Sequence, residues 1–155
     1  MALKPVAAAM EFYLISVYDP AVDLDASDVE AYKQTGDMAH IKMHEGESPT
    51  VFECRAPKAS AMLRISNSLH MNGVESEGGH GVMAQEAFRY GVRGVRNLQD
   101  DNGHDVTLAA GDFSGNPRGI KLAWVDDHIP WEVVLDIGAL VIVRSRLSEE
   151  DAKNS

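Results

Sequence analysis

The sequence predicts an α+β fold in which a small antiparallel sheet packs against three to four helices. Two short stretches rich in β-branched and aromatic residues are typical of strands, and longer stretches repeat apolar residues at helical spacing. The chain has 155 residues, the usual size of one domain. We therefore expect a single domain over residues 1–155, with residues 1–10 as a terminal arm that is loose unless a partner holds it.

The first half of the chain predicts two strands that pair with each other. Residues 12–18 form one candidate strand, which an Asp-Pro turn ends, and residues 50–55 form the other, with alternating apolar and polar positions. Together they suggest a small antiparallel sheet. Between them, residues 22–33 predict an exposed helix with Ser27 as its N-cap.

The middle of the chain predicts two helices separated by a loop. Residues 60–71 and 82–93 carry apolar side chains at helical spacing. Three glycines within residues 75–81 indicate a flexible loop that a partner would order. The Asn-Gly pair within residues 100–103 predicts a tight hairpin turn, with residues 106–108 as the returning strand.

The last third predicts a loop, a short element and a long helix. Residues 111–119 are expected to form a loop, and residues 120–126 a short element that carries Trp124. Pro130 stands where the first turn of a helix tolerates proline. We predict that this helix covers residues 131–147.

The final helix is apolar on every side, which is the most informative local feature of the sequence. Such a helix must be buried, inside the domain or against another subunit. We interpret the surplus of apolar surface as a contact site for other protein. The expected contact residues are Trp124, Trp131, Val134, Ile137 and Val141. Residues 140–143 would also suit a strand, and periodicity does not separate the two alternatives over so short a stretch.

The charge balance indicates which partners are disfavoured. The chain has 24 acidic and 14 basic side chains, a net charge of -10, which disfavours direct binding to nucleic acid phosphates. We interpret the basic group Arg89, Arg93 and Arg96 as a solvated or salt-bridged helix face. The longest apolar stretch, residues 129–143, contains two carboxylates and is shorter than the roughly 20 residues that cross a bilayer. No membrane contact is expected.

Two histidines suggest a metal hypothesis. His40 and His44 are four residues apart, which would place both on one face of a helix. The metalloprotease motif needs a glutamate directly after the first histidine, and Ile41 occupies that position. We therefore interpret both as solvated loop histidines and predict neither a metal nor a cofactor. A metal-binding protein or enzyme that uses His40 and His44 stays as an alternative.

Other candidate sites lack residues that their chemistry needs. Cys54 is the single cysteine, so no internal disulfide can form, and a lone cysteine in a strand is typical of a small buried hydrophobe. Residues 78–81 lack the lysine and the hydroxyl residue of a phosphate-binding loop. Residues 100–105 lack the glycine of a calcium loop at its sixth position. We predict a protein without enzymatic activity, made in the cytoplasm.

Two segments carry a resemblance to known proteins. Residues 94–98 (Gly-Val-Arg-Asn-Leu) precede the acidic residues 100–106, and residues 129–134 (Ile-Pro-Trp-Glu-Val-Val) open an apolar helix that leads to the ending 147–155. This pattern resembles small tailed-phage proteins of the tail assembly chaperone type. It covers roughly the last third to two fifths of the chain. The sequence departs from the pattern at Val95, where tryptophan is common, and in the loop of residues 111–119.

The resemblance implies a non-enzymatic structural or assembly protein of a tailed bacteriophage particle. The expected partners are other phage structural proteins, copies of the chain itself, or both, at the head-tail junction or along the tail. The expected location is the virion, which is assembled in the cytoplasm of the host bacterium. The alternative is a transient tail assembly chaperone that coats the tape-measure protein and leaves before the particle is complete.

Overall fold

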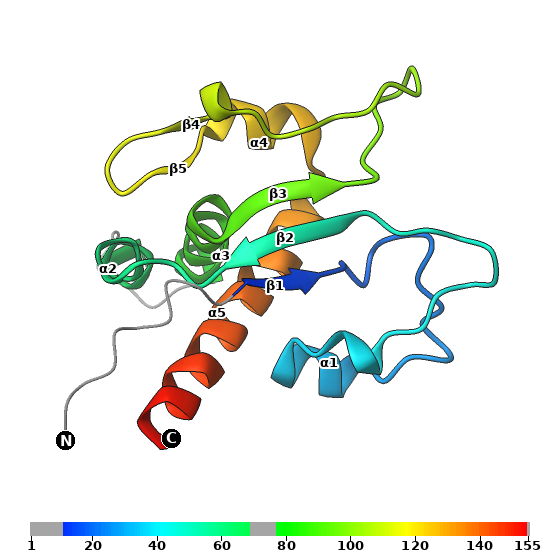
Figure 1. Cartoon of the computed structure of the whole chain (residues 1–155), viewed down its shortest axis with the longest axis horizontal. Coiled ribbons are helices and arrows are strands. Elements are labelled where there is room, and N and C mark those ends of the chain that lie inside the picture. The colour runs from blue at the N-terminus through cyan, green and yellow to red at the C-terminus, as the bar shows by residue number, and fades with distance from the viewer. Residues whose placement is uncertain (1–10, 69–76, 155) are drawn as a thin grey trace.

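Three strands form a central antiparallel sheet in the computed structural model, which describes residues 11–68 and 77–154 (Figure 1). The strands are β1 (Glu11–Leu14), β2 (Val51–Arg55) and β3 (Val92–Arg96), in the order β1-β2-β3. Because side chains alternate along a strand, the apolar positions of β1 and β2 point to one face, which is buried. In β3 a shift in the pairing with β2 lets Val92 and Val95, three positions apart, both be buried. The other face carries charged side chains and Tyr13.

Two long helices, α3 (Glu77–Gly91) and α5 (Trp131–Asn154), lie on the buried side of the sheet. The Phe88 ring of α3 meets the Phe52 ring of β2 edge-on, with 5.6 Å between centroids. The two helices approach so closely that a β-carbon at Gly138 would overlap the backbone carbonyl of Ala84. The glycine in α5 is therefore a packing requirement, since any side chain there would separate the helices.

Two shorter helices flank this pair. Helix α1 (Val29–Thr35) begins after Asp28, whose carboxylate accepts a hydrogen bond from the first turn, and ends at Gly36 with a φ of 65°. The buried Tyr32 hydroxyl donates to the carbonyl of Ile15 and accepts from its amide, at 2.6 and 3.0 Å. This pair of bonds fixes α1 against the chain that follows β1. Helix α2 (Ala59–Ser68) packs on α3.

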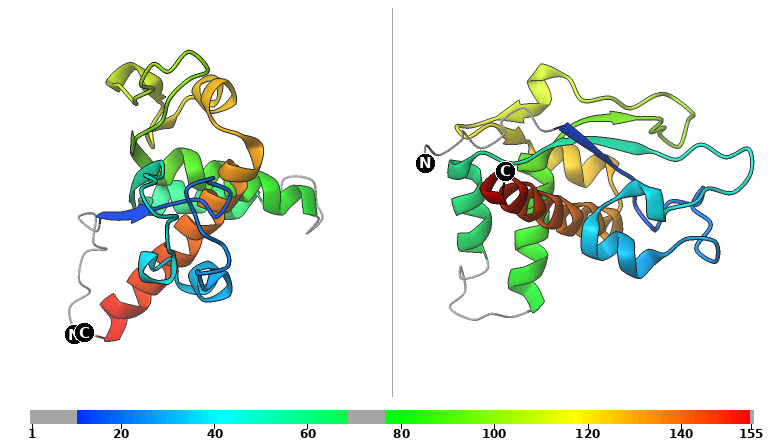
Figure 2. Two further views of the ribbon diagram at one scale, coloured as in Figure 1. Left: turned by 90° about the vertical axis from the view of Figure 1, so that its right-hand side faces the viewer. Right: turned by 60° about the horizontal axis from the view of Figure 1, so that its bottom comes forward.

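A two-stranded hairpin and one more helix lie on the far side of β3. The hairpin consists of β4 (Phe113–Ser114) and β5 (Gly119–Ile120), and α4 (Leu122–His128) follows it. Figure 2 shows, from two further directions, that α1 and this hairpin lie on opposite sides of the central sheet. Two short 3-10 helices, η1 (Met38–His40) and η2 (Ala110–Asp112), complete the described elements.

One cluster of buried apolar side chains draws on every layer of the described structure. Its largest fully buried members include Tyr32, Phe88, Leu14, Ile65 and Ile137, which come from α1, α3, β1, α2 and α5. Burial of this shared apolar surface is the main driving force that holds the layers together.

The predicted α+β class is confirmed, and the first two predicted strands pair antiparallel as expected. The described residues hold five α-helices, more than the three to four predicted, because residues 122–128 form a helix of their own. The proposed N-cap is also corrected. The carboxylate of Asp28 caps α1, whereas the Ser27 hydroxyl donates to the carbonyl of Asp23. The expected terminal arm, residues 1–10, lies outside the described residues.

The predicted flexible loop at residues 75–81 is wrong in its second part, because residues 77–81 form the start of α3. Packing against α5 stabilises a helix there despite three glycines, whose low helix propensity tertiary contacts can override. Residues 92 and 93, which were expected to extend this helix, belong instead to β3. Residues 75 and 76 lie outside the described part of the chain.

The segments of residues 100–108 and 111–119 also differ from expectation. The Asn-Gly turn exists, since the amide of Gly103 donates to the carbonyl of Asp100 and Gly103 has a φ of 78°. The returning strand at residues 106–108 does not form, and the pairing shrinks to a single bridge between Gln99 and Asp105. Residues 111–119 are more ordered than predicted, because they contain β4 and the start of β5.

Candidate protein-binding surface

Most of the apolar side chains of helix α5 are buried by other parts of the same chain. Val134 is 1% exposed, Ile137 and Val141 are 0% exposed, and Trp124 of α4 is 7% exposed. These four expected contact residues are therefore core positions, and the idea that another protein must cover them is corrected. Trp131 differs, because it is 53% exposed.

The reason for this burial is the position of α5 at the centre of the fold. The helix packs against α3 and α1, and its Arg144 guanidinium lies 5.4 Å from the centroid of the Phe12 ring in β1. With neighbours around it, α5 must be apolar on several sides. The alternative strand at residues 140–143 is wrong, because these residues lie within α5.

The exposed part of α5 begins at its N-terminus, where Trp131 and Leu135 meet above a glycine of α3. The site for a β-carbon at Gly81 is 3.9 Å from Trp131 Cζ2 and 3.9 Å from Leu135 Cδ2. Both side chains therefore rest on the α3 backbone, and Trp131 is supported on one side by the fold. A tryptophan that is half-exposed and backed by two rigid helices is well placed to contact a partner.

A shallow groove continues this surface along α5. It has a volume of about 320 Å³ and is lined by Tyr18, Lys33, Glu132, Leu135, Asp136, Ala139 and Leu140. Tyr18 is 58% exposed, so its ring forms a second apolar feature at the groove. We name the exposed surface formed by Trp131, Leu135, Ala139 and Tyr18 the α5 surface.

Asp136 holds Tyr18 at this groove through a short relay. Its carboxylate accepts hydrogen bonds from the Ser16 hydroxyl at 2.9 Å and from the Val17 amide at 3.0 Å. The Ser16 oxygen in turn accepts from the Tyr18 amide at 3.2 Å. Burial raises the pKa of Asp136, while the two hydrogen bonds and Lys33 act in the opposite direction. The carboxylate thus fixes the turn after β1 onto α5.

The two histidines of the metal hypothesis do not share a helical face. His40 ends η1, and His44 lies beyond an extended segment, where its Nδ1 is 3.7 Å from the carboxylate of Asp23. Within residues 11–68 and 77–154, no group of three or more His, Cys, Asp or Glu side chains is arranged to hold a metal ion. Cys54 is buried in β2, and burial raises the pKa of its thiol, which disfavours the reactive thiolate.

The basic group Arg89, Arg93 and Arg96 is salt-bridged only in part. Arg89 pairs with Glu86 and Arg96 pairs with Glu53, each at 2.9 Å. Arg93 instead donates to the backbone carbonyls of Tyr90, Arg89 and Arg118. The predicted helix face is therefore wrong, because only Arg89 lies on a helix, whereas Arg93 and Arg96 belong to β3. Arg89 and Arg96 are salt-bridged as expected.

Sequence reasoning named Trp131 but missed Tyr18 and the groove. Tyr18 lies 113 positions from Trp131, and its place beside α5 depends on the bonds between Asp136 and residues 16–17. One signal was present, because a carboxylate inside an apolar helical stretch indicates a buried polar partner.

Comparisons of the chain with known protein families, curated proteins and solved structures found no match. Of the helices in the described residues, none has the combined length and apolar character needed to cross a membrane.

Proposed function

We propose that this chain is a non-enzymatic structural or assembly protein of a tailed bacteriophage particle, which binds other virion proteins at the head-tail junction or along the tail. The observation that carries the proposal is the α5 surface, where a half-exposed tryptophan adjoins an open groove. The resemblance of residues 94–106 and 129–155 to small phage assembly proteins gives the class of particle.

The α5 surface has the properties expected of a protein contact. Tryptophan and tyrosine are enriched among residues whose truncation weakens binding, and both Trp131 and Tyr18 keep more than half of their surface in solvent. The backbone beneath them is helical or tied down by Asp136, so little conformational entropy is lost on binding. Lys33 and Glu132 supply polar groups at the rim of the apolar centre, as in other protein interfaces.

The position of Trp131 also permits a clean test. Trp131 is the first residue of α5, where an acidic side chain interacts favourably with the helix dipole. Trp131→Glu should therefore fold while placing a charge at the centre of the contact. Charged substitutions at Val134, Ile137 and Val141 would not separate binding from folding, because all three are core residues.

The experiment compares Trp131→Glu with Leu63→Glu, a matched control on α2 whose leucine is 64% exposed and lies outside the α5 surface. Both variants are supplied to infected cells that lack the wild-type chain. We expect intact-particle yield to fall at least about tenfold for Trp131→Glu, since a central aromatic contributes about 2 kcal/mol or more, and to stay normal for Leu63→Glu. Normal particle yield with Trp131→Glu would overturn the proposal.

A further inference from the structure

The molecule has an acidic end and a basic end. Residues 19–47 carry eight acidic side chains and two lysines, a net charge of -6 out of -10 for the chain. Figure 1 shows the loop of residues 44–49 at one end of the longest axis, α2 and the β4-β5 turn toward the other, and α1 between them. Negative charge is therefore concentrated in one part of the molecule, away from α2 and the β4-β5 turn.

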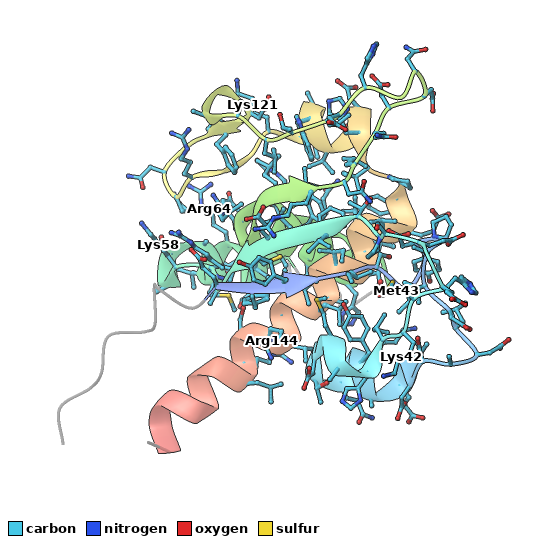
Figure 3. All side chains as sticks on the ribbon, turned by 45° about the vertical axis from the view of Figure 1, so that its right-hand side comes forward. Lys42, Met43, Lys58, Arg64, Lys121 and Arg144 are labelled. Carbon is cyan, nitrogen blue, oxygen red and sulfur yellow. The ribbon has the colours of Figure 1, made fainter. Side chains whose placement is uncertain are left out.

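The basic end contains a cavity of about 310 Å³ between the start of α2 and the β4-β5 turn. Four of the chain's 14 basic residues line it: Arg55, Lys58, Arg93 and Arg118. No carboxylate is among its lining residues in the described structure. Figure 3 places Lys58 beside α2 at this end, and Lys42 at the opposite end.

Local structure gathers these cations and leaves most of them without a carboxylate partner. The guanidinium groups of Arg93 and Arg118 lie over the same Phe113 ring, at 5.1 and 5.5 Å from its centroid. Arg55 pairs with Glu11 at 2.7 Å, but among the described residues Lys58, Arg93 and Arg118 form no ion pair. Burial lowers the pKa of Arg93, and the charges of Arg118 and Arg55 lower it further.

The first turn of α2 also favours an anion in this cavity. Lys58 precedes the helix, and its carbonyl accepts the hydrogen bond from Met62. A lysine side chain has no acceptor atom, so it cannot cap the free amides of the first turn. Lysine and arginine side chains together with these amides are the groups that bind carboxylates in proteins.

The acidic end presents carboxylates on two loops, residues 44–49 and 100–105. The Asn97 amide donates to the carbonyls of Ser48 and Pro49, at 2.9 and 3.1 Å, and the Thr50 hydroxyl donates to the carbonyl of Asn97. These bonds hold residues 48–50 against the residue that follows β3, and the turn of residues 100–105 extends away from the loop of residues 44–49 (Figure 1). Four exposed carboxylates lie on these two loops: Glu45, Glu47, Asp101 and Asp105.

We propose that the basic cavity binds the acidic loops of a second copy of this chain, so that molecules associate head to tail. Charge complementarity identifies the occupant, since both halves of the contact are present on one molecule at opposite ends. Such a contact is heterologous, and repeated copies form a ring if the rotation closes and a filament if it does not. The inference goes beyond the proposed function and rests on the charges alone.

The net charge of -10 opposes association at long range, but salt limits this repulsion. The screening length is about 10 Å at 0.1 M salt, so the contacting charges at the interface dominate over distant ones. At 1 M salt it falls to about 3 Å, which weakens the contact itself. Association should therefore occur at 0.1 M salt and be reversed at 1 M.

The experiment uses the full chain and sedimentation velocity over a range of concentrations. One variant removes positive charge from the cavity (Lys58→Gln with Arg118→Gln), and the other removes negative charge from the acidic loops (Glu47→Gln with Asp101→Asn). All these residues are exposed, and urea unfolding verifies that each variant folds. We expect the wild type to grow beyond its monomer mass of 16.9 kDa, and each variant alone to associate at least about tenfold more weakly.

A mixture of the two variants gives the decisive result. The cavity variant keeps its acidic loops, and the acidic-end variant keeps its cavity, so the mixture should form 1:1 dimers that grow no further. A wild type that stays monomeric at 0.1 M salt overturns the inference, as does a mixture that stays monomeric. Association that both charge-removing variants leave intact, but that Trp131→Glu abolishes, would assign self-contact to the α5 surface and also overturn the inference.

Discussion

Gly138→Ala is expected to destabilise the protein, although alanine is the better helix former. Gly138 lies inside α5, where an added β-carbon would overlap the backbone carbonyl of Ala84 in α3. Helix propensity alone favours alanine by about 1 kcal/mol. Overpacking of a core costs about 1–3 kcal/mol, and here the obstructing atom is backbone, which cannot rotate away as a side chain can.

The upper end of that range therefore applies, and we expect a net loss of about 2 kcal/mol in the free energy of unfolding. For a chain of this size, such a loss lowers the melting temperature by roughly 4–8 °C. Urea unfolding followed by circular dichroism measures both the midpoint and the slope.

Gly81→Ala is the matched control in the neighbouring helix. A β-carbon at Gly81 meets only side-chain atoms at 3.9 Å, an ordinary contact. The same glycine-to-alanine change should therefore stabilise the protein by about 0.5–1 kcal/mol. If Gly138→Ala also proves neutral or stabilising, the close α3-α5 contact is wrong. The explanation that packing against α3 buries the apolar side chains of α5 would then be wrong as well.

Three further predictions concern buried polar groups. Tyr32→Phe leaves the amide and carbonyl of Ile15 without their buried partner and should cost about 2–4 kcal/mol in urea unfolding; an unchanged midpoint would contradict the buried bonds. Burial raises the pKa of Asp136 above its ordinary value of 3.8, so the folded state holds the proton of this carboxyl group more tightly than the unfolded state does. The stability that the bound proton contributes is therefore present below pH 3.8 and lost as pH rises through the folded pKa. Unfolding free energies of the wild type and Asp136→Asn across this window should show that the wild type loses stability relative to the variant as pH rises, and a constant difference would refute the burial argument. The Cys54 thiol, which is 2% exposed, should react with a thiol reagent only after unfolding in urea, and stoichiometric labelling of the native protein would contradict its burial.

Local patterns predicted the layers of the fold well. The alternation at residues 51–54 predicted a half-buried strand, and Pro130 together with the apolar residues after it predicted the start of α5. Both signals are short-range, because side-chain period and proline geometry act within a few residues. The start of α3 was missed, since its glycines indicate a loop unless the contact with α5 is known.

The candidate site was predicted only in part, because exposure depends on long-range neighbours. Val134 and Trp131 are both apolar residues of the same predicted helix, yet Val134 is in the core and Trp131 is half-exposed. Periodicity shows that a helix is apolar, but not how many partners surround it within the same chain. Likewise, Arg93 and Arg118 are 25 positions apart, and only the β4-β5 hairpin brings them to one cavity.

The central claim, that the chain is a protein-binding component of a tailed-phage particle, is tested most directly by a mass-spectrometric inventory of mature particles purified from cells that produce it. We predict that the chain is present at a fixed copy number per particle, at a level comparable with other head-tail or tail proteins. Its absence from intact, infectious particles would contradict a structural role in the virion, and a chain required for tail assembly yet absent from particles would be a transient chaperone instead.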